Sequence, residues 1–212
     1  MENGRRLKAI NYALIYAYVV AHLFIIYFVL MQVPMPDEGG LKNLGSILGG
    51  GSVASVFVVI LVEAVSRDFK ARLVAMRWKD AMPGCRAFTV HIHEDSRINT
   101  VVLGKRYGPL PSTAREQNAL WYKLLKLNGD QEEVLHSHGR WLLLRDLTWV
   151  SLVLLVIAGL ASIRAPAPFH VMSLLLIALA MEFLLLRLMA KHASHDLVKT
   201  VLAIESAREV AQ

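Results

Sequence analysis

The 212-residue chain has a single cysteine, Cys85, and lacks the short motifs that mark the common enzyme families. One cysteine cannot form an internal disulfide, so a disulfide-stapled fold is excluded. There is no Walker loop and no GxGxxG, HExxH, GxSxG or CxxC sequence, which argues against a nucleotide-dependent or hydrolytic enzyme of those families. Charged residues make up only 19% of the chain, whereas hydrophobic residues make up 55%. This composition excludes a disordered chain and is unusual for a soluble enzyme.

Four long apolar runs dominate the sequence, at residues 9–33, 44–64, 147–163 and 169–186. About 20 helical residues cross the hydrocarbon core of a bilayer, whereas runs of roughly 10–14 residues are typical of buried core helices. The first run is too long for the apolar part of a signal peptide, and no small-residue cleavage site follows it. The sequence therefore predicts a mainly α, polytopic membrane protein with four transmembrane helices.

Lysine and arginine are distributed unevenly between these runs. The N-terminus, residues 65–146 and the tail carry 21 of the 23 basic residues, and the two hairpin loops carry only Lys42 and Arg164. Because basic residues accumulate on the cytoplasmic side, we expect a multi-pass inner-membrane protein with both termini and residues 65–146 in the cytoplasm. The net charge of +6 then reflects topology and attraction to lipid headgroups, and nucleic acid is not a favoured partner.

This topology divides the chain into four parts. Residues 1–64 hold transmembrane helices 1 and 2, and residues 147–186 hold helices 3 and 4. Residues 65–146 form a small cytoplasmic insertion between helices 2 and 3, and residues 187–212 form a cytoplasmic C-terminal helix.

The insertion is predicted to be helical with a possible α+β character. Apolar residues at helical spacing predict that residues 65–81 continue helix 2. The alternation in residues 88–93 predicts a short strand, and residues 97–103 a second one. Thr113 and Glu116 have the spacing of a capping box, which predicts a helix from there to about residue 127. The following helix is expected to run without a break into the third span.

Helix 2 carries rows of small residues. Gly45 and Gly49 form a GxxxG pair, and Ser46, Gly50 and Ala54 form a second row. Small side chains let membrane helices approach closely, so these residues are predicted to form a helix-packing surface. A contact within the chain, self-association and a bend that lines an opening are all compatible with this pattern.

Among the few ionisable residues within the predicted spans, His22, Glu63 and Glu182 are the candidates for an intramembrane role. Ionisable groups at membrane depth are costly and often functional. Glu63 lies at the cytoplasmic end of its span, and Glu182 is five residues from Arg187, so a partner on another helix is expected for it. A neutral His22 bonded to a neighbouring helix is the simplest expectation, because three such groups are too few for an ion pathway.

Cys85, His91 and His93 are the alternative candidates for a metal site. On a strand, His91 and His93 would share one face, and with Cys85 they would offer ligands that suit zinc. Closed zinc sites usually carry paired cysteines, however, and the chain has none. The sequence therefore predicts no metal and no other cofactor.

Arg187 and His192 fit R-x4-H, the pattern of HEPN ribonucleases. In that pattern the arginine would stabilise phosphate charge and the histidine would act as an acid or base. Pairs with spacing R-x4–6-H occur four times in this chain, one of them in an extracytoplasmic loop. The pattern is therefore an alternative, and we predict that both residues are structural.

Part of the chain resembles a segment of bacterial inner-membrane proteins, in LPS at residues 110–112, REQNALWY at residues 115–122 and LLLRD at residues 142–146. Four spans around a basic cytoplasmic segment also resemble the small membrane components of bacterial phage-defence loci. One such group accompanies RNA-targeting CRISPR effectors and carries an R-x4-H near its C-terminus, as Arg187 and His192 do here. The resemblance implies an oligomeric membrane effector that perturbs the cell envelope.

The sequence thus favours a non-enzymatic membrane protein that acts as an oligomeric effector, sensor or scaffold and is controlled through its cytoplasmic segment. Its expected partners are the lipid bilayer, further copies of the chain and a cytoplasmic protein. Two alternatives remain open, a membrane-tethered HEPN-like ribonuclease that uses Arg187 and His192, and a small transporter.

Overall fold

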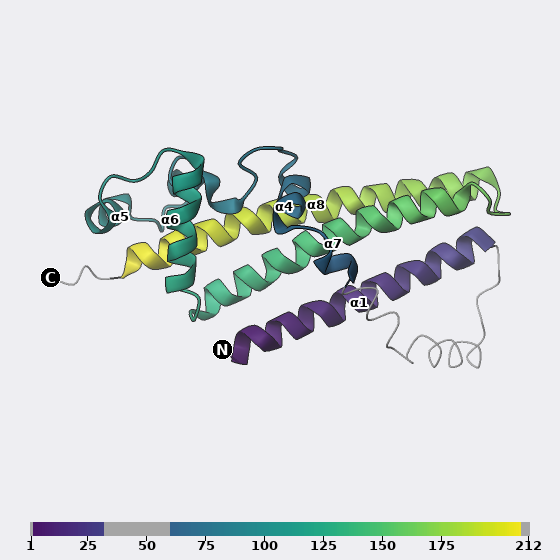
Figure 1. Ribbon diagram of the computed structural model, residues 1–212, viewed down its shortest axis with the longest axis horizontal. Helices are drawn as coiled ribbons and strands as arrows, with labels where there is room; N and C mark the ends of the chain where they lie inside the picture. The colour runs from purple at the N-terminus through teal and green to yellow at the C-terminus, as the bar shows by residue number, and fades with distance from the viewer. Residues whose placement is uncertain (1, 32–59, 209–212) are drawn as a thin grey trace. The chain divides into compact units, whose positions relative to one another are not determined.

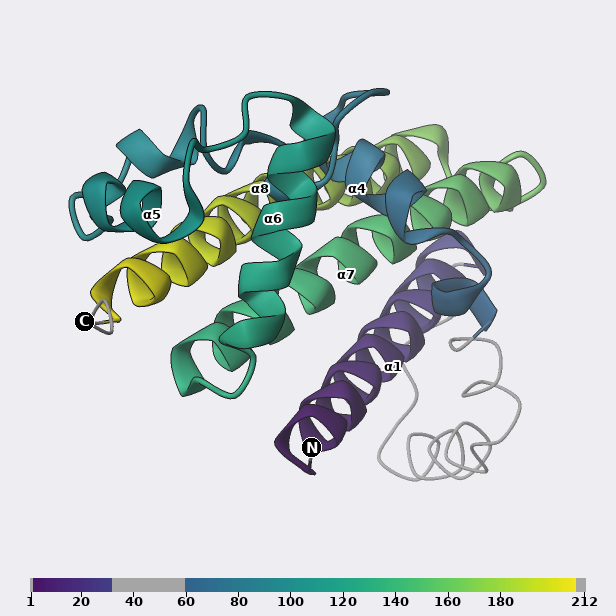
Figure 2. The same ribbon diagram turned by 60° about the vertical axis from the view of Figure 1, so that its left-hand side comes forward.

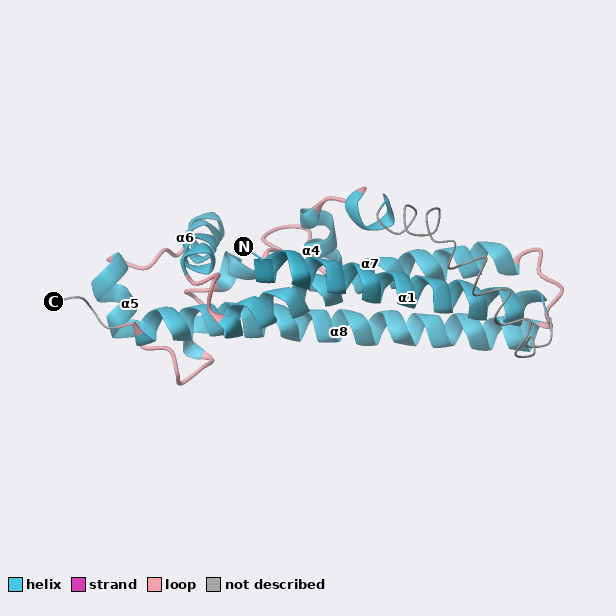
Figure 3. Cartoon of the chain, turned by 90° about the horizontal axis from the view of Figure 1, so that it is seen from below, coloured by secondary structure: helices cyan, strands magenta, loops and turns pink. Residues whose placement is uncertain are grey.

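The computed structural model of the chain describes residues 2–31 and 60–208. This described part is mainly helical and contains no strand (Figure 1, Figure 3). Its elements are α1 (Glu2–Met31), α4 (Arg67–Ala75), the 3-10 helices η1 (Pro83–Arg86) and η2 (His91–His93), α5 (Thr100–Tyr107), α6 (Ala114–Leu127), α7 (Glu132–Ser162) and α8 (Phe169–Ala207).

Three helices, α1, α7 and α8, are long and apolar enough to cross a membrane. They correspond to the first, third and fourth predicted runs. The second run, residues 44–64, lies outside the described residues except for its last five, of which residues 60–63 are helical. The rows of Gly45, Gly49, Gly50, Ser46 and Ala54 also lie outside the described residues.

The chain divides into two compact units. The first unit comprises Met1–Ser66 and Asp146–Leu186, and the second comprises Arg67–Arg145 and Arg187–Gln212. Helices α7 and α8 each contribute residues to both units without a break.

The core of the first unit is formed by one stripe on each of its helices. On α1 and α7 the buried residues are four or seven positions apart, so they lie on one face of each helix. They are Ile15, Val19, Ile26 and Leu30 on α1, and Val150, Leu154 and Ala158 on α7. The apolar part of α8 buries Leu175 and Leu179 but exposes Leu174, Ile177 and Met181. Exposed residues of this kind suit contact with lipid.

The second unit is built around the C-terminal half of α8. There Leu197, Val198, Val201 and Leu202 are completely buried. Figure 2 shows α5 and α6 beside this end of α8, and Leu103 and Leu124, which these helices contribute, are also completely buried. Residues 187–207 therefore form the core helix of the second unit.

The two predicted strands are wrong. Residues 88–93 form a turn followed by η2, and residues 97–103 form a turn followed by the start of α5. The backbone N–H groups of Phe88 and Thr89 donate to the side-chain oxygen of Gln117, at 3.0 and 3.2 Å, rather than to a neighbouring strand. The side-chain oxygen of Asn99 accepts from the backbone N–H groups of Val101 and Val102 in the first turn of α5 and caps that helix. A side chain 29 residues away thus decides the conformation of the first segment.

Residues 65–81 do not form the expected helix that continues the second apolar run. Residues 64–66 are not helical, and α4 begins only at Arg67. It ends at Ala75 because Met76 adopts a left-handed conformation with φ 52°. The N–H of Arg77 then donates to the carbonyl oxygen of Arg72 at 3.3 Å, a pattern that closes helix C-termini.

The later helices agree with the prediction. Helix α6 begins after Thr113, whose hydroxyl accepts from the backbone N–H of Glu116 and contacts its carboxylate at 2.7 Å. Helix α7 runs unbroken from Glu132 into the third apolar run.

Candidate functional site

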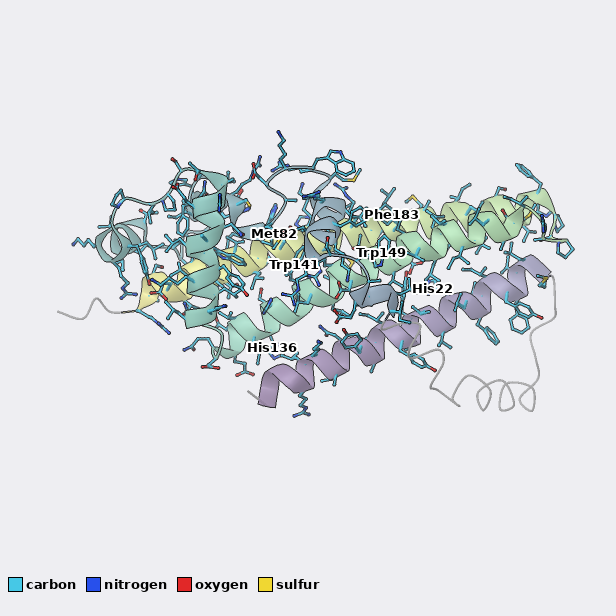
Figure 4. All side chains as sticks on the ribbon, viewed as in Figure 1. His22, Met82, His136, Trp141, Trp149 and Phe183 are labelled. Atoms are coloured by element: carbon cyan, nitrogen blue, oxygen red, sulfur yellow. The ribbon has the colours of Figure 1, made fainter. Side chains whose placement is uncertain are left out.

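The second unit contains a cavity of about 210 Å³. It is lined by four parts of this unit, namely α4, the segment of residues 77–94, α7 at Trp141, and α8 near residues 191–195. Met82 and Trp141, labelled in Figure 4, both contribute to its wall. The cavity therefore depends on contacts between segments that are about a hundred residues apart in the sequence.

Three potential ligand groups converge in the cavity wall: His91, Glu94 and His195. The Nδ1 atom of His91 lies 2.9 Å from Oε2 of Glu94, and the rings of His91 and His195 are 4.6 Å apart at their centroids. One ligand atom from each of the three residues lies within 4.8 Å of the other two. His91 is buried, His195 is half-buried and Glu94 is exposed.

The surroundings of this cluster shift the pKa of two of its members, Glu94 and His195. The hydrogen bond with His91 lowers the pKa of Glu94, so this group is a carboxylate at neutral pH. Burial, together with the neighbouring His91, lowers the pKa of His195 to about 4, so its imidazole is neutral. The cavity wall also contains three cationic side chains, from Arg77, Arg86 and Lys191.

Only one of the three sequence-based metal candidates belongs to this cluster. His91 does, but the alternative set of Cys85, His91 and His93 is not brought together. His93 is exposed, because η2 replaces the strand that would have placed it beside His91. Cys85 is buried, and burial raises the pKa of its thiol, so it is a poor thiolate ligand.

Arg187 and His192 both lie on α8 within the second unit, on different faces because they are five residues apart. Arg187 is half-buried, and its Nε atom is buried with no hydrogen-bond partner among the described residues. His192 is exposed, whereas His195, one turn further on, faces the cavity. The structure does not bring the R-x4-H pair together in one site.

The predicted intramembrane polar residues form two pairs within the first unit. Nε2 of His22, labelled in Figure 4, lies 2.9 Å from Oε2 of Glu182 and thereby joins α1 to α8. Glu63 accepts a hydrogen bond from the hydroxyl of Tyr12, and its carboxylate is 3.8 Å from Nζ of Lys8. Glu182 thus has its partner on another helix rather than at Arg187.

Sequence analysis missed a buried carboxylate, Glu205, whose side chain is only 2% exposed. Three groups donate to it, each at 2.7 Å: Nη1 of Arg106, the hydroxyl of Tyr107 and Nδ2 of Asn128. Burial and the hydrogen bond to Glu205 raise the pKa of Tyr107 to about 12. A lone acid within the apolar run VLAIES at residues 201–206 was the signal that could have indicated it.

No protein-family model, curated protein sequence or solved structure matches the chain.

Proposed function

We propose that this chain is a multi-pass membrane protein whose second unit is a cytoplasmic ligand sensor for its membrane helices. One observation carries this proposal. The helix that lines the cavity through Lys191, Ser194 and His195 is α8, the same unbroken helix that supplies an apolar segment to the first unit. A ligand that shifts this part of α8 acts directly on a candidate membrane span.

The apolar helices and the basic residues support the membrane arrangement. Three helices are long and apolar enough to span, and the second apolar run would supply a fourth. In the proposed arrangement the turn that contains Arg164 is extracytoplasmic, and both termini and the second unit are in the cytoplasm of a cell with an inner membrane.

The biological role that follows is that of an oligomeric effector, sensor or scaffold, and phage defence is a setting compatible with it. The chemistry of the cavity favours sensing over a HEPN-like ribonuclease, because Arg187 and His192 lie on different faces of α8. A transporter is disfavoured, because His22 and Glu182 bond to each other and the third intramembrane residue, Glu63, bonds to Tyr12.

Filling the cavity after folding tests this proposal. Ala75 lies in the cavity wall, so an Ala75→Cys variant in a Cys85→Ala background can be folded and then modified with a bulky maleimide. We expect the modification to slow hydrogen–deuterium exchange in residues 169–186, because a filled cavity fixes the position of α8.

The matched control is Lys123→Cys, an exposed position on α6, modified with the same reagent in the same background. It should leave exchange in residues 169–186 unchanged. If the Ala75→Cys modification also leaves these residues unchanged, or alters the second unit alone, the cavity does not control the membrane helices.

A further inference from the structure

We propose that His91, Glu94 and His195 form a binding site for a divalent transition-metal ion of the zinc class, with a fourth coordination position open to the cavity. This inference deepens the proposed function, because it names the ligand of the same cavity. The site itself depends only on residues of the second unit.

The donor set fits such an ion in type and number. Two imidazole nitrogens and one carboxylate oxygen are a known ligand set for zinc sites that keep one position open. Ligands at about 2.1 Å from a tetrahedral ion lie roughly 3.4 Å from one another, and the three ligand atoms here lie within 4.8 Å of one another. Nδ1 of His91 already lies 2.9 Å from Oε2 of Glu94, so the remaining closure involves the half-buried side chain of His195.

The surroundings of the cluster hold these donors in place before an ion arrives. His91 is fixed by burial, with a side chain only 5% exposed. His195 lies on the helix α8 between the fully buried residues Ala190 and Leu197.

The cavity wall suggests what would occupy the open position. The single carboxylate of Glu94 leaves a divalent ion with a net positive charge. In the rest of the wall the three cations Arg77, Arg86 and Lys191 outnumber one acid, Asp80. An anionic fourth ligand would offset this excess, so the site is suited to a metal-bound anion. Zn²⁺ alone is sufficient to test the three protein ligands.

The experiment uses the purified full-length chain in detergent, stripped of metal with a chelator. Zn²⁺ is then titrated in competition with a chromophoric chelator, and bound metal is counted by mass spectrometry. We expect one Zn²⁺ per chain. Loss of a ligand in Glu94→Ala or His195→Ala should weaken binding by about 100-fold or more, since even the partners of ligands contribute 10–100-fold.

Two exposed histidines provide matched controls: His93, two residues after His91, and His192, three residues before His195. His93→Ala and His192→Ala should bind Zn²⁺ as tightly as the unmodified chain. Thermal melting of the metal-free proteins shows whether each variant is folded. If His195→Ala does not fold, Glu94→Ala still tests the site, because Glu94 is exposed and its replacement should not disturb the core.

Three results would overturn the proposal: no stoichiometric Zn²⁺ binding, full affinity in a folded Glu94→Ala variant, or an equal loss in the two control variants. The last would mean that surface histidines hold the metal. If Zn²⁺ binds stoichiometrically but hydrogen–deuterium exchange in residues 169–186 is unchanged, the metal site is supported and the proposed function is contradicted.

Discussion

Replacing Glu205 with alanine is expected to lower the free energy of unfolding of the second unit by about 3–5 kcal/mol, the cost of removing one member of a buried charge pair. The substitution leaves Arg106, Tyr107 and Asn128 without their shared acceptor. These groups come from α5 and from the C-terminal cap of α6, so one carboxylate connects both helices to α8. Urea unfolding in detergent, followed by tryptophan fluorescence, measures the loss.

The matched control is Glu132→Ala, because the Glu132 side chain is 89% exposed and its nearest ionic partner, His136, is 3.9 Å away. That variant should change the free energy of unfolding by no more than about 0.5 kcal/mol. Equal, small effects of both substitutions would show that Glu205 does not organise the second unit.

Glu205 should also make the stability of the second unit depend on pH. Burial raises the pKa of Glu205, but the hydrogen bonds from Asn128, Tyr107 and Arg106 lower it by more, so the net shift is downward. The stabilisation is therefore fully present above the ordinary glutamate pKa of about 4.3 and is lost as the pH falls below it. Glu205→Gln should flatten the stability profile in this acidic range.

Replacing Gly84 with alanine should lower the free energy of unfolding by about 1–3 kcal/mol, the usual cost of overpacking a core. A Cβ atom at Gly84 would lie 2.6 Å from Cε3 of Trp121 and 2.8 Å from Oδ1 of Asn118. These contacts are too close for any real Cβ atom, and Trp121 is buried and cannot move aside. The same unfolding assay measures the effect.

Gly104 supplies a control of opposite sign. It lies within α5, and a Cβ atom there would meet nothing within 4 Å. Gly104→Ala should therefore raise the free energy of unfolding by up to about 1 kcal/mol through helix propensity. A neutral Gly84→Ala would contradict the close contact of η1 with Trp121 of α6, and a destabilising Gly104→Ala would contradict the open space beside Gly104 on α5.

The features predicted correctly from sequence are those that a short stretch of chain decides. The length of the apolar runs indicated α1, α7 and α8, and the spacing of Thr113 and Glu116 indicated the start of α6, because capping involves residues within one turn. The unbroken course of α7 followed in the same way, since no proline or glycine cluster interrupts it.

The features that were missed depend on contacts between distant residues. The alternation in residues 88–93 favoured a strand. The side-chain oxygen of Gln117 instead accepts hydrogen bonds from the backbone N–H groups at the start of this segment, which forms a turn followed by η2. His91 meets His195 across about a hundred residues, and Glu205 meets Arg106 across a similar separation. No local pattern encodes such pairs, so only the fold reveals the histidine cluster and the buried carboxylate.

The central claim is that the second unit lies on the cytoplasmic side of a membrane that α8 crosses, and site-directed labelling tests it most directly. Arg164→Cys and Lys123→Cys, both exposed positions, are placed singly in a Cys85→Ala background and treated with a membrane-impermeant maleimide on spheroplasts. We predict that Arg164→Cys is labelled at once and that Lys123→Cys is labelled only after permeabilisation. Labelling of Lys123→Cys on intact spheroplasts, or of both positions only after permeabilisation, would contradict the account.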